Sequence, residues 1–241
     1  MKETPILFSG PMVRAIVSGR KTMTRRVVKT QPDMSEYPDS KPTAITSHGY
    51  KWPVVEWASP SLAGRGSGVA PFQTRCPYGT VGDRLWVREA FSLVPCSAGV
   101  EKYPEGFDPK KSSVSQPNAP GYGARYKATW DRSHSCGWKP SIHMPRWASR
   151  LTLKITGVRV ERVCEISAQD IIAEGVVDRP HKVEGLSGDC PVSAVDGICY
   201  PDLRSVWYAA WAKINGAESL KANPWVWVVS FKRAELERGQ T

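Results

Sequence analysis

A run of basic and hydroxyl side chains near the amino terminus is the part of the sequence best suited to chemistry. Residues 18–26 read Ser-Gly-Arg-Lys-Thr-Met-Thr-Arg-Arg, and Glu3 is the only acidic residue among the first 26. The local charge is therefore positive and uncompensated. Such a cluster is typical of a site for an anionic ligand, with nucleic acid as the first candidate. The alternative is a basic loop that only keeps the protein soluble.

The whole chain is also basic. Its formal net charge is +10 and its pI is about 9.4, which favours polyanionic partners. With 241 residues, 41% of them hydrophobic, and ten tryptophans, it is expected to fold around a sizeable core. Length alone allows one elaborated domain or two small ones.

No targeting, membrane or metal signal stands out. Pro11 and Arg14 interrupt the apolar amino terminus, and no run approaches the roughly 18 apolar residues of a membrane span. We therefore expect a cytoplasmic protein without membrane contact. The six cysteines are then expected to be reduced thiols. No C-x-x-C pair occurs and His134–Cys136 is the only close His/Cys pair, so we expect no metal and no cofactor.

Simple elements surround the basic cluster. Apolar residues at helical spacing predict a helix over 12–17, with Ser9 as its cap and Gly19 as its end. The cluster would then begin at a helix C-terminus, where the dipole favours cations. A strand is predicted to start at Thr24.

Further elements are predicted along the chain. Alternating patterns predict strands near 85–88, 125–130, 151–163 and 225–231. A helix over 167–175 would be capped by Ser167 and ended by Gly175, and residues 203–214 form an amphipathic helix whose tryptophans face the core. The sum is a mixed α+β fold.

Several segments in order resemble one family. Gly19-Arg-Lys-Thr-Met-Thr24, Gly82-Asp-Arg-Leu-Trp86, 166–175 and 223–231 are similar to the ASCH domain, a PUA-like family of small β-barrels with flanking helices. The resemblance implies one domain over 1–241 with irregular loop insertions at about 29–75, 92–124 and 178–201. Residues 140–150 resemble a longer form often found in prophage regions.

The resemblance also implies an activity. Some small ASCH members are amidohydrolases that remove the acetyl group from N4-acetylcytidine. Carried over by motif, their catalytic residues become Lys21, Thr24 and Glu174. This chain keeps all three residue types, but it is longer, has Met23 between the threonines, and carries insertions that could reshape the pocket.

Amide hydrolysis assigns a role to each of these groups. Thr24 would supply the nucleophilic hydroxyl, and Lys21, with its pKa lowered by neighbouring arginines, would act as the base. Glu174 would orient the amine or share in proton transfer. The neighbouring arginines would lower the pKa of Lys21, stabilise developing negative charge or hold a substrate phosphate. These arginines are Arg20, Arg25 and Arg26. Alternatively, Lys21 and Glu174 form only a salt bridge and Thr24 is only a strand residue.

Three further residues are candidates for substrate binding. Trp86 could stack on a base, as aromatic residues do for single-stranded nucleic acid. Glu89 could present a carboxylate near the mouth of the expected barrel, or could pair with a nearby arginine. His143 could donate a hydrogen bond in the pocket, or could be structural.

Three functions remain open. The first is a hydrolase acting on the exocyclic amide of a modified nucleoside or nucleotide. The second is a non-catalytic module that binds RNA or a modified base. The third, from the resemblance alone, is a ribonuclease in which basic residues stabilise the scissile phosphate. The sequence does not indicate an oligomeric state.

Overall fold

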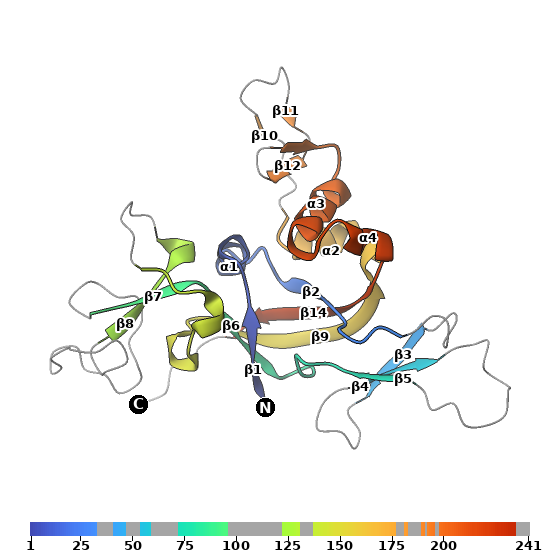
Figure 1. Ribbon diagram of the computed structural model, residues 1–241, viewed down its shortest axis with the longest axis horizontal. Coiled ribbons are helices and arrows are strands. Elements are labelled where there is room, and N and C mark those ends of the chain that lie inside the picture. Colours follow the sequence, from blue (N-terminus) through green and yellow to red (C-terminus); the bar gives the residue numbers. More distant parts are fainter. Residues whose placement is uncertain are drawn as a thin grey trace. The chain divides into compact units, whose positions relative to one another are not determined.

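The structure is a computed structural model, and it shows a mixed α+β protein (Figure 1). It describes residues 1–32, 41–46, 54–58, 72–95, 122–130, 137–176, 181–182, 189–190, 192–195 and 198–234. The α-helices are α1 (Gly10–Val17), α2 (Ala168–Ala173), α3 (Leu203–Asn215) and α4 (Glu218–Ala222). The longer strands are β1 (Glu3–Leu7), β2 (Met23–Val27), β6 (Arg84–Arg88), β9 (Thr152–Arg162) and β14 (Trp225–Arg233).

The shorter strands form small sheets of their own. They are β3 (Lys41–Thr46), β4 (Val54–Ala58), β5 (Phe72–Arg75), β7 (Phe91–Pro95), β8 (Tyr122–Tyr126), β10 (His181–Lys182), β11 (Asp189–Cys190), β12 (Val192–Val195) and β13 (Ile198–Tyr200). The sheet orders are β3-β4-β5, β7-β8, β10-β11 and β12-β13. No sheet recorded for the described ranges closes into a barrel.

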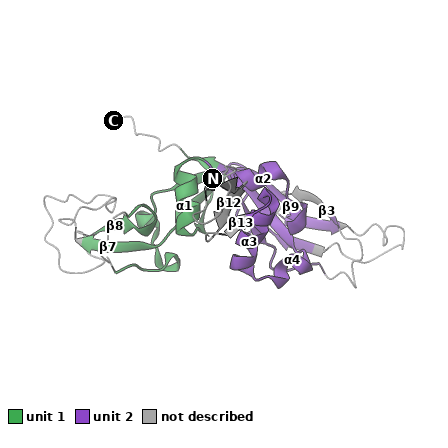
Figure 2. Ribbon diagram, turned by 90° about the horizontal axis from the view of Figure 1, so that it is seen from above, with its two compact units in different colours: residues 1–19, 83–154, 232–241 green, residues 20–82, 155–231 purple. Residues whose placement is uncertain are grey.

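The chain divides into two compact units (Figure 2). Unit 1 comprises residues 1–19, 83–154 and 232–241, and unit 2 comprises residues 20–82 and 155–231. The boundary cuts β9 and β14, so each of these strands contributes residues to both units. The predicted catalytic residues all belong to unit 2.

In unit 1, β6 lies between two neighbours, as its apolar alternation predicted. It pairs in parallel with β1 and antiparallel with the first residues of β9. Leu85 and Val87 are buried, whereas Trp86 and Arg88 are half-buried, because successive side chains of a strand point to opposite faces. This unit also contains a cluster of buried side chains formed by Phe91, Ala124, Tyr126, Met144 and Ala148.

In unit 2, the sheet order runs β9-β14-β2, with β14 antiparallel to β2. One core joins this sheet to α2 and α3. It contains Met23 of β2, Ile171 of α2, Trp207 and Trp211 of α3, and Val226 and Val228 of β14. The two tryptophan rings lie 5.3 Å apart between centroids. The prediction that these tryptophans serve the core rather than a ligand is consistent with this packing.

The ends of α2 form as predicted. The Ser167 hydroxyl accepts a hydrogen bond from the Asp170 amide, which satisfies one of the free N–H groups of the first turn. Glu174 is the C-cap, and Gly175 follows with a φ of 96°, a conformation that costs glycine little. Glu174 is thereby placed at the carboxyl end of α2. In α1, by contrast, Ser9 occupies the N-cap without a side-chain hydrogen bond.

Other local predictions need correction. The strand expected over 125–130 ends at Tyr126 and continues as a 3-10 turn, Lys127–Thr129. Ile214, assigned to the apolar face of α3, is 60% exposed. Helix α4 was not predicted. Strands β3, β4 and β5 lie within a range expected to be irregular, where the buried Val54, Val55 and Trp57 interrupt a largely polar sequence. Strands β10 to β13 lie within 178–201, which was also expected to be irregular, and β7 and β8 extend into the range 92–124.

The aromatic strand β14 is more deeply buried than its pattern suggested. Alternation predicted one apolar face, formed by residues 225, 227, 229 and 231. In the structure every residue from Trp225 to Val229 is buried, so neighbouring parts of unit 2 cover both faces of this stretch. No helix in the described ranges has both the length and the apolar character to cross a membrane.

Candidate active site

The site is built where the chain enters β2 beside the carboxyl end of α2. The Thr22 amide donates to the Ala173 carbonyl at 2.8 Å, and the Phe231 amide donates to the Thr22 carbonyl at 2.8 Å. These bonds fasten the residues before β2 to α2 on one side and to β14 on the other. Lys21 is therefore held next to Glu174 by main-chain contacts as well as by its own side chain.

Lys21 and Glu174 form a buried ion pair. The Lys21 Nζ lies 2.6 Å from the Glu174 Oε2 and also donates to the Glu174 main-chain carbonyl at 2.9 Å. The side chains are 1% and 9% exposed. The structure thus brings together two of the three predicted catalytic residues, which lie 153 positions apart.

The pKa of Lys21 is lowered, and burial is the largest cause because it penalises the charged ammonium. The Glu174 carboxylate opposes this by attraction and by its hydrogen bond, while Arg26 and Arg25 lower the pKa further by repulsion. The direction agrees with the sequence prediction. The main cause is different: the neighbouring arginines are a smaller influence than removal from water.

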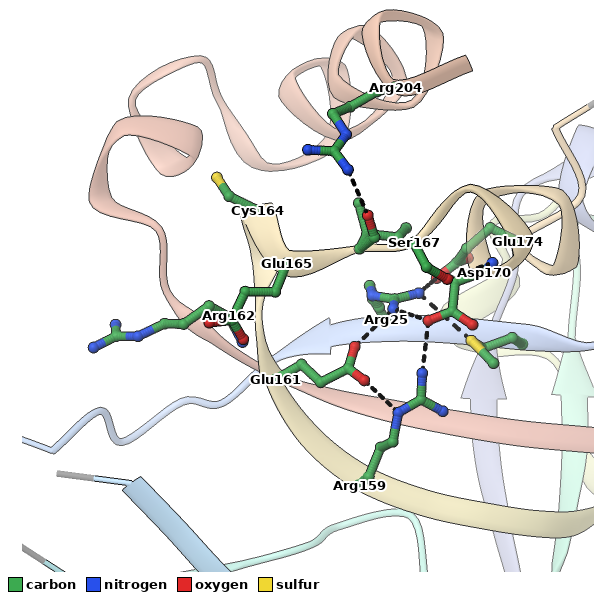
Figure 3. A network of polar contacts seen from close by, with 12 residues as sticks. Arg25, Arg159, Glu161, Arg162, Cys164, Glu165, Ser167, Asp170, Glu174 and Arg204 are labelled. Atoms are coloured by element: carbon green, nitrogen blue, oxygen red, sulfur yellow. Dashed lines mark hydrogen bonds and ion pairs between the residues drawn. The ribbon is translucent and has the colours of Figure 1, made fainter.

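Arg25 is part of a larger ionic network (Figure 3). Its Nη2 lies 2.6 Å from Asp170 Oδ2 and 2.8 Å from Glu161 Oε2, and its Nη1 lies 3.7 Å from Glu174 Oε1. Arg159 also binds both Asp170, at 2.6 Å, and Glu161. Because the Arg25 side chain is only 1% exposed and engaged with carboxylates, its predicted role as a substrate-binding residue is not supported by this geometry.

The two carboxylate oxygens of Glu174 differ. Oε2 accepts the hydrogen bond from Lys21, whereas Oε1 is buried and has no hydrogen-bond partner among the described residues. The Arg25 Nη1 lies 3.7 Å from this Oε1 atom. A buried carboxylate oxygen without a donor is costly, so this atom has an unused capacity to accept a hydrogen bond.

Thr24 is buried in β2, opposite Val229 of β14. Side chains alternate along a strand, so Thr24 points to the face of β2 opposite to that of Met23 and Arg25. Within the described ranges, no hydrogen bond joins its hydroxyl to Lys21 or Glu174. Among the described residues, Thr24 is therefore not hydrogen-bonded to either of the other two candidates.

The remaining basic candidates differ in exposure. Arg20 is exposed and Arg26 is half-buried. Arg26 acts electrostatically on Lys21 and also on Tyr78, whose pKa is raised by burial despite the opposing charge of Arg26. Of the predicted arginines, Arg20 and Arg26 are thus the two with side chains that reach solvent beside the site.

Three predicted binding residues belong to unit 1 and not to the unit that holds Lys21. Both Glu89 oxygens accept hydrogen bonds from Arg150, at 2.9 and 3.0 Å. Glu89 thus pairs with an arginine, which was the alternative to a substrate-binding role. Trp86 has the guanidinium groups of Arg88 and Arg146 at 5.4 and 5.8 Å from its ring centroid. His143 is exposed, in a 3-10 turn.

Sequence reasoning missed three members of the network: Arg159, Glu161 and Asp170. A weak signal existed, because Arg159 and Glu161 are two apart on a strand and therefore share a face. Asp170 and Glu174 are four apart at the end of a helix, so they also lie on one side. Among the residues with described positions, no group of three His, Cys, Asp or Glu side chains could hold a metal ion.

Comparisons with protein-family models, with curated proteins and with solved structures each gave no match. Conclusions about function therefore depend on the geometry of the site.

Proposed function

We propose that the protein is a hydrolase of the PUA-like ASCH type that cleaves the exocyclic amide of an N4-acylated cytidine nucleoside or nucleotide. The observation that carries the proposal is the buried Lys21–Glu174 pair, with Nζ and Oε2 2.6 Å apart. A lysine with a lowered pKa gives up its proton more easily, which favours a neutral amine that can act as a base.

The free oxygen of Glu174 supports the same chemistry. Its Oε1 atom has no hydrogen-bond partner in the described part of the chain, so it can accept one from the amide N–H of a substrate. The N4 nitrogen of an N4-acylated cytosine carries such a hydrogen. The carboxylate would then orient the scissile amide while Lys21 handles the proton.

In the proposed reaction, Lys21 starts as the neutral amine. A hydroxyl attacks the acyl carbon and its proton passes to Lys21. When the C–N bond breaks, the same proton passes from Lys21 to the departing N4 amine, so that cytidine is released and the acyl group stays on the hydroxyl oxygen. Thr24 is the proposed hydroxyl, and water would then release the acyl group as a carboxylic acid. Substrate binding would require Thr24 and Lys21 to approach the same acyl group.

The test uses purified protein and N4-acetylcytidine, with cytidine and acetate followed by chromatography and mass spectrometry. We expect turnover by the natural protein and a loss of at least about 100-fold in Lys21→Ala and Glu174→Gln, the size of general acid–base effects. Thr24→Ala should abolish turnover if Thr24 is the nucleophile, whereas Thr24→Ser should retain it. Full activity in Lys21→Ala, or no turnover of any N4-acylated cytidine, would refute the proposal.

Binding of RNA or a modified base without catalysis is the second candidate. It is favoured by the net charge of +10, which exceeds the need of a free nucleoside. Affinity for oligonucleotides that falls steeply with salt, with no product formed, would support it. Gel analysis of the same RNA after incubation separates binding from ribonuclease activity.

A further inference from the structure

Arg25 has the most contacts with acidic side chains in the candidate site. A single guanidinium lies within 4.0 Å of Glu161, Asp170 and Glu174, although its side chain is 1% exposed. A buried charge is tolerated only when it is paired and hydrogen-bonded. Moving Arg25 to a ligand would leave these carboxylates without it, so the geometry disfavours contact with substrate.

The charges around Arg25 balance. The recorded ion pairs connect three cations with three carboxylates, namely Lys21, Arg25 and Arg159 with Glu161, Asp170 and Glu174. These groups come from three parts of unit 2. Lys21 lies just before β2 and Arg25 lies in β2. Asp170 lies in α2 with Glu174 at its C-cap, and β9 supplies Arg159 and Glu161. Arg26 adds a further positive charge near Lys21.

Within this network Arg25 is the cation that reaches both ends of α2. Its Nη2 binds Asp170 in the first turn, and its Nη1 lies near the otherwise unbonded Oε1 of Glu174 at the C-cap. Arg159 binds Asp170 and Glu161 but has no recorded contact with Glu174 in the described ranges. Of the two arginines, Arg25 is therefore the one that lies close enough to the Glu174 carboxylate to influence its orientation.

We infer that Arg25 is a positioning residue: anchored by Asp170 and Glu161, its guanidinium holds the Glu174 carboxylate in the orientation that faces Lys21, and it does not bind ligand. The inference rests on the proposed function for its role in catalysis. The orientation of Glu174 by Arg25 can be measured whether or not the protein turns over a substrate. Without the guanidinium, Glu174 would lose this restraint, and its charge would then stabilise the Lys21 ammonium less.

The test is an NMR titration of the Lys21 side-chain amine in protein with labelled lysine. Lys21→Arg identifies the signal. We expect Glu174→Gln to lower the titration midpoint in the natural protein and to lower it much less in an Arg25→Gln background, because a carboxylate no longer held against Lys21 stabilises the ammonium less. Arg25→Lys keeps the charge but cannot span three carboxylates, so it should also reduce the effect of Glu174→Gln. Arg159→Gln is the matched control and should leave the effect of Glu174→Gln unchanged.

An undiminished effect of Glu174→Gln in folded Arg25→Gln would overturn the inference, as would an equal reduction in the Arg159→Gln background. If the Arg25 variants do not fold, the NMR signals of the Arg25 guanidinium are measured in the natural protein. A guanidinium held by several carboxylates should show separate Nη signals that exchange slowly with water, whereas one averaged, rapidly exchanging signal would contradict the inference. None of these measurements needs activity, so they remain decisive even if N4-acylated cytidines are not substrates.

Discussion

Lys21 holds Glu174 at two points, because its Nζ donates to the side-chain Oε2 at 2.6 Å and to the main-chain carbonyl at 2.9 Å. The carbonyl at the C-cap of a helix has no partner within the helix, so Lys21 satisfies it while neutralising the carboxylate. One ammonium thus completes the end of α2 and sets the electrostatics of the site.

Replacing Lys21 should destabilise the protein strongly. Lys21→Met leaves a buried carboxylate and an unbonded carbonyl, and we expect a loss of about 3–5 kcal/mol in the free energy of unfolding. Adding Glu174→Gln should recover part of that loss, since the second change removes the carboxylate charge that Lys21 no longer neutralises. Urea unfolding of the two single variants and the double variant measures the coupling. Strictly additive losses would show that the pair contributes nothing beyond its separate side chains.

The lowered pKa of Lys21 predicts a pH dependence with a definite sign. Between the lowered folded pKa and the ordinary value of 10.5, the unfolded chain binds a proton that the folded protein has lost. Stability contributed by this site should therefore rise with pH through that window. The measurement is the difference in unfolding free energy between the natural protein and Lys21→Met at several pH values. A difference that moves against the natural protein as pH rises would contradict the lowered pKa.

Two ion pairs in unit 1 should differ widely in their effect on stability. Glu89 is 2% exposed at its side chain and receives two hydrogen bonds from Arg150, whose guanidinium also lies 4.0 Å from the Tyr126 ring centroid. Arg150→Met should cost about 3–5 kcal/mol because it removes two hydrogen bonds from a buried carboxylate. The exposed pair of Arg146 with Glu3 is the control, and Arg146→Met should cost less than about 1 kcal/mol. Equal losses by thermal or chemical unfolding would reject this ranking.

Cys76 should be an unreactive thiol. Burial raises its pKa from 9.0 to about 11, although the Tyr78 and Gly79 amides oppose the shift. Iodoacetamide at pH 8–9 should therefore modify Cys76 only after unfolding. Because the folded state keeps the proton that the unfolded state loses near 9.0, stability from this site should fall as pH rises from 9.0 to 11. Cys76→Ala should lack that component. Rapid alkylation of Cys76 itself in the folded protein, located by mass spectrometry, would contradict the prediction.

Local sequence signals were sufficient for the elements that carry their own determinants. Helix α2 formed with the Ser167 cap and the Gly175 stop because both act within one turn. The alternation around Leu85 and Val87 correctly indicated a strand with neighbours on both sides. The prediction that Ile214 is buried was wrong. Ile214 follows the apolar spacing of α3, but the last turn of this helix has no surface to cover it in the described part of the chain, so the side chain is exposed.

Residue types and local spacing by themselves determined the α+β composition, most of the long elements, and the basic cluster from which Lys21 was singled out. Only the tertiary structure decided what each cation contacts. Arg20 and Arg25 belong to the same basic run, yet Arg20 is exposed and Arg25 lies among carboxylates supplied by α2 and β9. The physical reason is that strand alternation selects the face, whereas the acidic partners come from segments more than 130 residues away, and no local pattern near residue 25 encodes that meeting.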